Sequence, residues 1–209
     1  MYFTHRQGSV ALPAMNQGFV LKLGIEMAHT YLNSLWFMPM VVVAAPAFSA
    51  DYLTVAQAQA LIFDKAAVFS ERPTLLSSDA KDQIKDLSGV RQRQDQQPIW
   101  KVEKDGQFLG WFVVDDVVGK HEYITYAIGI SPQGEVLGLE VLSYRETHGG
   151  QVREASWRDQ FHGKTLKDPF KLDEDVSNIS GATLSCRNLL DGVKRLLVIH
   201  QLFLSQSVA

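Results

Sequence analysis

The chain of 209 residues is poor in cysteine, has no excess of positive charge and lacks a long apolar run. Its one cysteine, Cys186, can form no internal disulfide and no cysteine-rich metal site. Lys and Arg total 20 against 23 Asp and Glu, a net charge of -3, which argues against a nucleic-acid partner. No GxGxxG follows a predicted strand, which argues against a nicotinamide dinucleotide. The histidines match no standard metal-ligand spacing, so we predict no metal site.

What remains is an ordinary globular composition, 46% hydrophobic and 21% charged. A chain of this length is sufficient for one or two domains with a sizeable core. Composition therefore limits the class of protein but assigns no function.

The longest apolar run, residues 35–48, is interrupted by Pro39 and Pro46 and ends in small residues before Asp51. A membrane-spanning helix needs about 20 apolar residues, so this run is too short. We interpret residues 1–50 as a signal peptide cleaved near Ala50, with an uncleaved N-terminal membrane anchor as the alternative. Both interpretations place the rest of the chain in the periplasm or another extracytoplasmic space.

Residues 51–97 are predicted to form a helical lead segment and a connector. One helix is expected over 51–63, where Thr54 and Gln57 have the spacing of a capping box. A second is expected over 79–87, ended by Gly89. The polar stretch 90–97 contains no anchoring apolar side chain and is interpreted as an exposed connector.

Residues 98–209 are predicted to form the main domain. A two-residue period indicates four antiparallel strands joined by turns at Asp105-Gly106 and at 131–134, with the strands over 99–103, 108–114, 121–130 and 136–144. A short helical piece is expected over 155–161. From Ala182 or Thr183 onward, apolar residues recur at helical spacing to Leu204. The fold class is therefore α+β, a twisted antiparallel sheet of about four or more strands packed against a long C-terminal helix, with an N-terminal helical segment.

The start of the long helix reads Ser180-Gly181-Ala182-Thr183-Leu184-Ser185. Unpaired N–H groups and the positive end of the helix dipole favour a phosphate at such a point. Gly181 would let the backbone approach closely, and Thr183 and Ser185 add hydroxyls in one turn. The spacing alone equally fits an ordinary helix N-cap.

This hexapeptide resembles the flavinylation motif of the FMN-binding domain family, whose members occur in the sodium-translocating NADH:quinone reductase and in the RNF complex. The resemblance extends over about residues 123–204 and includes the loop 146–150. It implies that Thr183 carries FMN through a phosphoester bond, installed by a magnesium-dependent flavin transferase with FAD as donor. The cofactor-binding residues that it implies are Thr183, Ser180, Gly181, Ala182, Ser185, Glu146, Thr147 and His148.

Two positions depart from the family's pattern. Ser177 stands where the family usually has an aspartate, and His148 replaces the proline of the loop. The resemblance implies an exported electron-transfer flavoprotein with a redox partner at or near the membrane, such as a quinone reductase or a cytochrome. We identify no catalytic acid–base residues. The alternative hypothesis is an exported interaction module that keeps the fold and has lost the flavin.

Overall fold

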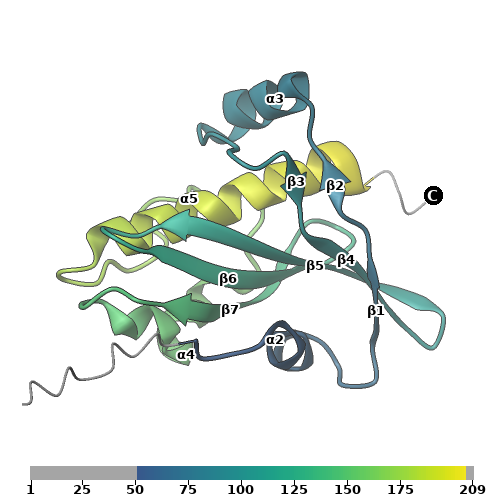
Figure 1. The fold of residues 1–209 in the computed structure, drawn as a ribbon, viewed down its shortest axis with the longest axis horizontal. Helices are drawn as coiled ribbons and strands as arrows, with labels where there is room; N and C mark the ends of the chain where they lie inside the picture. Colours follow the sequence, from purple (N-terminus) through teal and green to yellow (C-terminus); the bar gives the residue numbers. More distant parts are fainter. Residues whose placement is uncertain (1–50, 206–209) are drawn as a thin grey trace, which may run out of the picture. The chain divides into compact units, whose positions relative to one another are not determined.

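The computed structural model describes residues 51–205, so the predicted signal peptide lies outside the described residues. Its centre is a five-stranded antiparallel sheet in the order β1-β4-β5-β6-β7 (Figure 1). The strands are β1 (Val68–Glu71), β4 (Ile99–Lys104), β5 (Gln107–Val118), β6 (Tyr123–Ile130) and β7 (Val136–Tyr144). A separate two-stranded ribbon pairs β2 (Thr74–Leu75) with β3 (Gln96–Gln97).

Both predicted hairpins are present. Asp105 and Gly106 both have positive φ, 53° and 78°, so they form the tight turn between β4 and β5. Gly134, with φ of 85°, lies in the turn between β6 and β7. The predicted four strands are therefore confirmed, and β1 adds a fifth at the edge.

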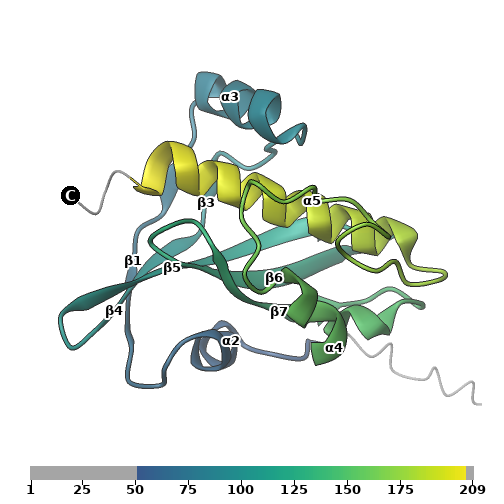
Figure 2. The ribbon, with the colours of Figure 1, turned by 180° about the vertical axis from the view of Figure 1, so that it is seen from behind.

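The sheet is covered by helices on both faces. Helix α5 (Thr183–Ile199) lies along one face, and α2 (Val55–Ile62) lies against the other (Figures 1 and 2). Neighbouring residues of β5 consequently enter different cores: Trp111 belongs to the cluster under α5, and Phe112 belongs to the cluster with α2. This double burial explains the uninterrupted apolar stretch in β5.

The lead segment contains the two predicted helices with shifted ends. Thr54 caps α2 in the expected capping box with Gln57. Helix α3 (Ser78–Ser88) ends at Gly89, whose φ is 76°, and it packs against α5. The predicted short helical piece is α4 (Ala155–Arg158) followed by the 3₁₀ turn η3 (Asp159–Phe161), and a further 3₁₀ turn, η2 (Gly150–Arg153), precedes them.

The interpretation of residues 90–97 as an exposed connector without anchors is wrong. Gln92 and Gln97 are buried, and the Gln97 amide donates to the carbonyl of Val114 at 2.7 Å. The Gln92 amide in turn donates to the Gln97 side chain at 3.3 Å. Buried amides, which a hydropathy pattern cannot reveal, anchor this segment to β5.

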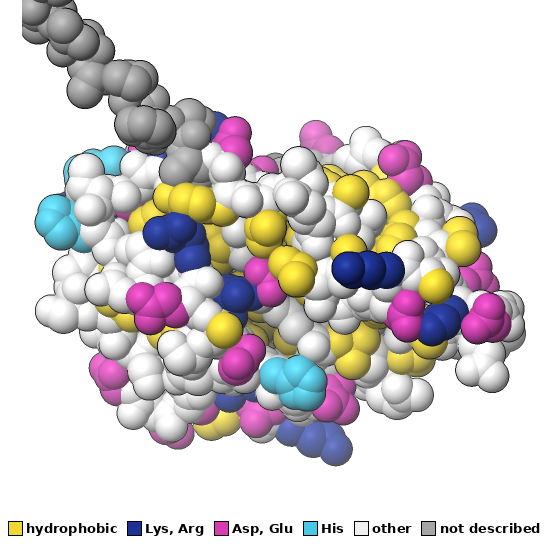
Figure 3. Space-filling model, turned by 90° about the horizontal axis from the view of Figure 1, so that it is seen from below, with side chains coloured by type: hydrophobic (Ala, Val, Ile, Leu, Met, Phe, Trp, Pro, Cys, Tyr) yellow, Lys and Arg dark blue, Asp and Glu magenta, His cyan; other side chains and the backbone are white. Residues whose placement is uncertain are grey.

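On the surface, the face seen in Figure 3 intersperses Lys and Arg with Asp, Glu and hydrophobic side chains. Large hydrophobic side chains that remain exposed include Leu61 and Val68. Between residues 51 and 205, no helix has the length and apolar character to cross a membrane.

A charged network is buried between α5 and the sheet. Arg195 Nη2 donates to Asp115 Oδ2, and the Tyr126 hydroxyl donates to the same oxygen at 2.7 Å. The Asp115 side chain is fully buried, and the Arg195 side chain is only 6% exposed. Burial raises the pKa of Asp115, while the Arg195 charge opposes that shift. The pair fixes α5 on the sheet at the cost of desolvating two charges.

Replacing Arg195 with Met should lower the free energy of unfolding by about 3–5 kcal/mol, because Asp115 would be left as an unpaired buried charge. Urea denaturation measures the change. Lys194→Met, one position earlier on a more exposed face of α5, should stay within about 0.5 kcal/mol of the wild type. Equal losses in the two variants would contradict a role for the buried pair.

His200 begins the π-helical turn η4 (His200–Leu204) and is 3% exposed. Its Nε2 has no hydrogen-bond partner in the described part of the chain. Burial lowers the pKa of His200 below its ordinary value of 6.5. The folded state therefore holds this imidazole neutral.

His200 should make stability depend on pH. The unfolded state binds the proton more tightly, so the contribution is complete above the unfolded pKa and is lost as the pH falls through it toward the lower folded pKa. Urea denaturation at about pH 7.5 and about pH 5.5 should give a lower free energy of unfolding at the acidic pH. His200→Leu should reduce that difference, and an unchanged pH profile would contradict this assignment.

Candidate functional site

The N-terminus of α5 follows a tight turn. The Ala182 amide donates to the Ile179 carbonyl at 2.9 Å, and Gly181 in this turn has a φ of 80°. A Cβ added at Gly181 would meet no atom within 4 Å. Glycine is therefore required by the left-handed backbone, and not by the close backbone approach expected from the sequence.

No side chain of the described residues caps the first turn of α5, whose N-cap position is Ala182. The amide groups at such a helix start have no intrahelical acceptor and carry the positive end of the dipole. Thr183 is exposed, so its hydroxyl is accessible at this point. Ser185 is 2% exposed and accepts a hydrogen bond from the Tyr144 hydroxyl at 3.3 Å. The two hydroxyls predicted for one turn thus differ, because only that of Thr183 is exposed.

The loop 146–150 is held directly against this helix start. The Tyr144 hydroxyl donates to the His148 carbonyl at 2.5 Å, and burial raises the pKa of Tyr144. Gly149 has a φ of 86°, and a Cβ there would overlap that of Ala182 and lie 2.6 Å from the Tyr144 hydroxyl. The loop and the hexapeptide therefore form one packed unit.

Glu146 fastens a second loop to the site. Its Oε1 accepts from the amides of His121 and Glu122 at 2.6 and 3.0 Å. Burial raises the pKa of Glu146, but the amides of Glu122, His121 and Lys120 together lower it by more, so it lies below the usual range. This carboxylate remains charged and is neutralised locally by amide dipoles, which makes it a clamp between loops.

These loops and the helix start enclose a cavity of about 360 Å³, within the range of about 300–1,000 Å³ common for ligand pockets. Seven of the eight cofactor-binding residues implied by the resemblance line it, and Ser180 does not. Its lining residues are Lys120, His121, Glu146, Thr147, His148, Gly181, Ala182, Thr183, Leu184 and Ser185.

The sequence pattern did not mark Lys120 as a site residue, and it assigned His121 to an ordinary exposed loop. Both lie in the connection between β5 and β6, about 60 residues from the hexapeptide in sequence. Lys120 and His121 are exposed, so no hydropathy signal distinguishes them. Only the antiparallel pairing of β5 with β6 and the Glu146 clamp bring them beside Thr183.

His148, which replaces a proline in the loop, lies at the cavity and its Nδ1 is 2.9 Å from the Thr147 hydroxyl. His121 lines the same cavity, whereas His162 does not. Within the described range 51–205, no three His, Cys, Asp or Glu side chains gather as a metal site would require.

The segment before the hexapeptide is anchored through its backbone. The Ser177 amide donates to Gln160 Oε1 at 2.8 Å, and its carbonyl accepts from the Trp157 indole at 2.8 Å. The nearby carboxylates are engaged elsewhere, since Asp175 accepts from Lys164 at 3.0 Å and Asp173 accepts from the Asn178 amide at 3.1 Å. Neither takes the place of the aspartate that Ser177 replaces.

Trp157, considered from the sequence as either core or a cofactor neighbour, is 5% exposed and is not among the residues that line the cavity. Its ring packs edge-on against Phe161, with centroids 5.2 Å apart. Cys186 is fully buried, as a lone cysteine on an apolar helix face is expected to be, and burial raises its pKa.

The residues present fit a phosphate-bearing group. An uncapped helix start, an exposed hydroxyl and the cationic Lys120 converge on one cavity, while the one acidic side chain among its lining residues has its charge directed at backbone amides. Leu184, 46% exposed, adds an apolar surface at the rim.

Gly149→Ala should destabilise the protein by about 2 kcal/mol or more, because the added methyl overlaps Ala182 in a backbone region that alanine rarely adopts. Thermal denaturation measures this loss. Gly89→Ala is the matched control: it has a similar φ and open space around it, so it should cost about 1 kcal/mol. If both variants lose the same stability, the loop is not packed on the helix start as described.

Two curated relatives come from membrane redox complexes. The G-type subunit of the ion-translocating oxidoreductase complex from Shewanella oneidensis is 34% identical over 88 residues, which cover 37% of this chain and 42% of that protein. Its counterpart from Shewanella baltica is 34% identical over 87 residues, covering 36% and 41%. The matched part thus spans less than half the length of these relatives.

Two solved structures are also similar. The crystal structure of Shewanella oneidensis NqrC covers 66% of this chain and 83% of that chain, with 20% identity and a TM-score of 0.49. The C-type subunit of the Na⁺-translocating NADH-quinone reductase from Parabacteroides distasonis covers 64% and 77%, with 15% identity and a TM-score of 0.44.

The family match falls on the part of the chain that builds the cavity. Residues 119–198 run from the loop that contains Lys120, through the loop 146–150, to the helix that begins at Thr183. These residues match the family described as FMN-binding domain, which confirms the resemblance first indicated by the hexapeptide.

Proposed function

We propose that this protein is an electron-transfer flavoprotein whose FMN is joined through its phosphate to the hydroxyl of Thr183. The observation that carries the proposal is the exposed Thr183 at an uncapped helix start, inside a cavity built entirely from residues of the FMN-binding match. The phosphate of such an ester would lie where the helix dipole and the free amides favour an anion.

Each residue of the cavity has a distinct part in this proposal. The amides of the first turn of α5 and the Lys120 ammonium would hold the phosphate. Glu146 would keep the 119–122 loop in place, and Tyr144 would keep the His148 loop against α5. Leu184 would exclude water at the rim.

Attachment requires one exchange of bonds at phosphorus. The Thr183 oxygen forms a P–O bond to the flavin-side phosphate of FAD, the bond to the adenylate half breaks, and the hydroxyl proton is released. A flavin transferase would catalyse this exchange, since the described residues beside Thr183 offer only His121, His148 and the engaged Glu146 as acid–base groups. When bound, FMN supplies reversible electron transfer, which amino-acid side chains do not provide.

We further propose an extracytoplasmic location, reached through the predicted signal peptide or anchor at residues 1–50, and a redox partner at or near the membrane. A covalent link would retain the cofactor where free flavin is not supplied. The relatives are named as subunits of ion-translocating oxidoreductase complexes, which supports a quinone reductase or cytochrome as partner.

The alternative of an interaction module without flavin has one observation in its favour. Ser177 lacks the carboxylate of the family's usual aspartate, and both Asp173 and Asp175 are engaged elsewhere. If the transferase uses that carboxylate, attachment would be slow or absent. In that case Thr183→Val would leave partner binding unchanged.

Thr183→Ala should abolish covalent flavin, because it removes the only oxygen to which the ester is assigned. The protein is co-expressed with a flavin transferase, denatured and examined by in-gel fluorescence and intact-mass spectrometry. Wild type should fluoresce and carry the mass of one FMN less one water.

Thr147→Ala is the matched control, since it removes another threonine hydroxyl from the same cavity. It should retain the fluorescence and the mass increase. Wild-type protein that carries no flavin under these conditions, or a Thr183→Ala variant that keeps it, rules out the phosphoester at Thr183.

A further inference from the structure

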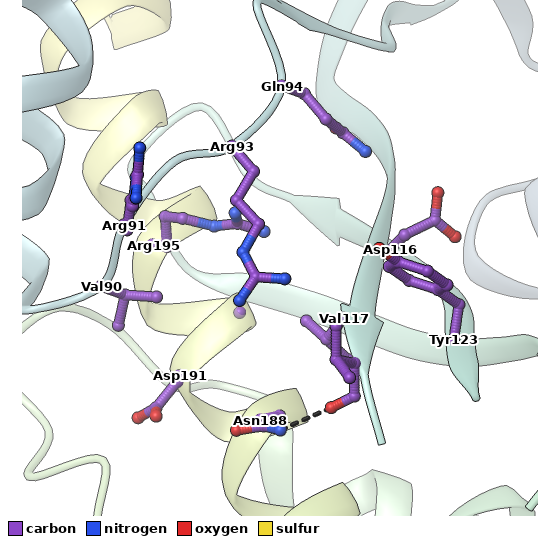
Figure 4. Close-up of a pocket in the computed structure, with 12 residues that line it drawn as sticks. Val90, Arg91, Arg93, Gln94, Asp116, Val117, Tyr123, Asn188, Asp191 and Arg195 are labelled. Atoms are coloured by element: carbon purple, nitrogen blue, oxygen red, sulfur yellow. Dashed lines mark hydrogen bonds between the residues drawn. The ribbon is translucent and has the colours of Figure 1, made fainter. Parts of the chain in front are cut away.

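A second cavity, of about 570 Å³, lies on the α3 side of α5 and is larger than the one at Thr183. Its walls come from the connector after α3, the adjoining ends of β5 and β6, and the middle of α5 (Figure 4). Neither Thr183 nor the loop 146–150 contributes to it. It is therefore separate from the proposed flavin site.

The connector that forms one wall is held rigidly. Ser88 Oγ donates to the Ile84 carbonyl at 2.6 Å and accepts from the Val90 amide at 3.0 Å. Gln92 is buried between Arg91 and Arg93. Anchoring of the residue between them fixes the two arginines on the connector, where both line the cavity wall.

The two guanidinium groups have no acidic partner. Among the ion pairs formed within residues 51–205, none includes Arg91 or Arg93. Figure 4 shows Arg93 extending from the connector across the cavity toward Val117, with Arg91 beside it. Two positive charges are thus presented to one enclosed space without neutralisation.

The wall formed by α5 adds a third cation whose donors are not all used. Arg195 is 5% exposed and lines the cavity; one of its terminal nitrogens is paired with Asp115, while its Nε has no partner among the described residues. Gln94 Oε1, in the opposite wall, is also buried without a partner in that part of the chain. Buried polar atoms without partners are rare in folded proteins and indicate a missing ligand or water.

Two carboxylates line the same space, and they differ in their engagement. Asp116 accepts from the Thr125 hydroxyl at 2.6 Å. Asp191 is half-buried, and burial raises its pKa against the opposing effect of Lys194 and Arg187. The cavity therefore has an arginine-rich side on the connector, with Asp191 as the main source of repulsion for an anion.

We propose that this cavity binds a small organic anion whose carboxylate or phosphate groups pair with Arg91 and Arg93. Guanidinium groups match carboxylate and phosphate oxygens in geometry and in charge. Val90, Val117 and the ring of Tyr123 supply apolar surface for the carbon frame of such a ligand. The volume lies in the range of about 300–1,000 Å³ that holds small molecules. The proposal does not depend on flavin at Thr183.

Amide chemical-shift titration of the purified full-length chain tests the proposal, with succinate and inorganic phosphate as separate probes. Saturable shifts should appear in residues 90–94 and 188–195, and the tighter probe distinguishes carboxylate from phosphate chemistry. Arg91→Gln/Arg93→Gln should weaken binding about tenfold or more, as loss of charged hydrogen bonds predicts. Neither side chain belongs to the hydrophobic core, so the double variant should fold normally.

Lys65→Gln/Arg72→Gln is the matched control, because it removes two exposed positive charges away from the cavity. It should bind each probe within about twofold of the wild type. Asp191→Asn should tighten binding about threefold by removing repulsion.

Three results would overturn the proposal. The first is equal weakening in the two double variants. The second is a set of shifts confined to residues 181–185, which would place the anion at the helix start; Thr183→Val would then abolish them. The third is an absence of saturation for both probes up to about 50 mM, which would leave Arg91 and Arg93 as solvated surface charges.

Discussion

Helix α5 packs lengthwise against one face of the sheet, and this contact positions the whole candidate site. Its apolar residues Leu189, Val193 and Leu196 are almost fully buried, and the Asp115–Arg195 pair fixes the helix on β5. Because the helix cannot slide or rotate without exposing that face, its first turn is held at the end of the sheet beside the two loops. The position of Thr183 therefore follows from core packing.

The loops at that end are held by a small number of polar contacts and a crowded glycine. Glu146 satisfies the amides of one loop, and Tyr144 links the other loop to α5. Gly149 leaves no room for a side chain against Ala182. The cavity is thus largely formed before any ligand enters, which lowers the ordering cost of binding.

Charge is distributed unevenly along α5. At its start the free amides and Lys120 favour one anion, while near its middle Arg91, Arg93 and Arg195 face a second cavity. Asn188 lies between the two and donates to the Val118 carbonyl at 2.5 Å, which holds the helix against the end of β5. One helix therefore contributes to two cavities in a chain whose net charge is only -3.

Local sequence patterns were enough to predict four strands, their tight turns, the long helix and the region where it begins. These features depend on periodicity and on glycine or capping residues whose backbone preferences act over a few positions. The hexapeptide also supplied the resemblance that the family match confirms. Such patterns could not determine contacts between distant segments.

Tertiary contacts placed Lys120 and His121 beside Thr183, added β1 to the sheet and buried Gln92 and Gln97 in a segment whose sequence indicated full exposure. They likewise gathered Arg91 and Arg93 with Arg195 around one cavity. Surface cations and buried amides produce no hydropathy signal, and their neighbours are fixed by strand pairing and helix packing between segments far apart in the chain. Polar contacts are selected by three-dimensional proximity, whereas a sequence pattern records only burial along one element.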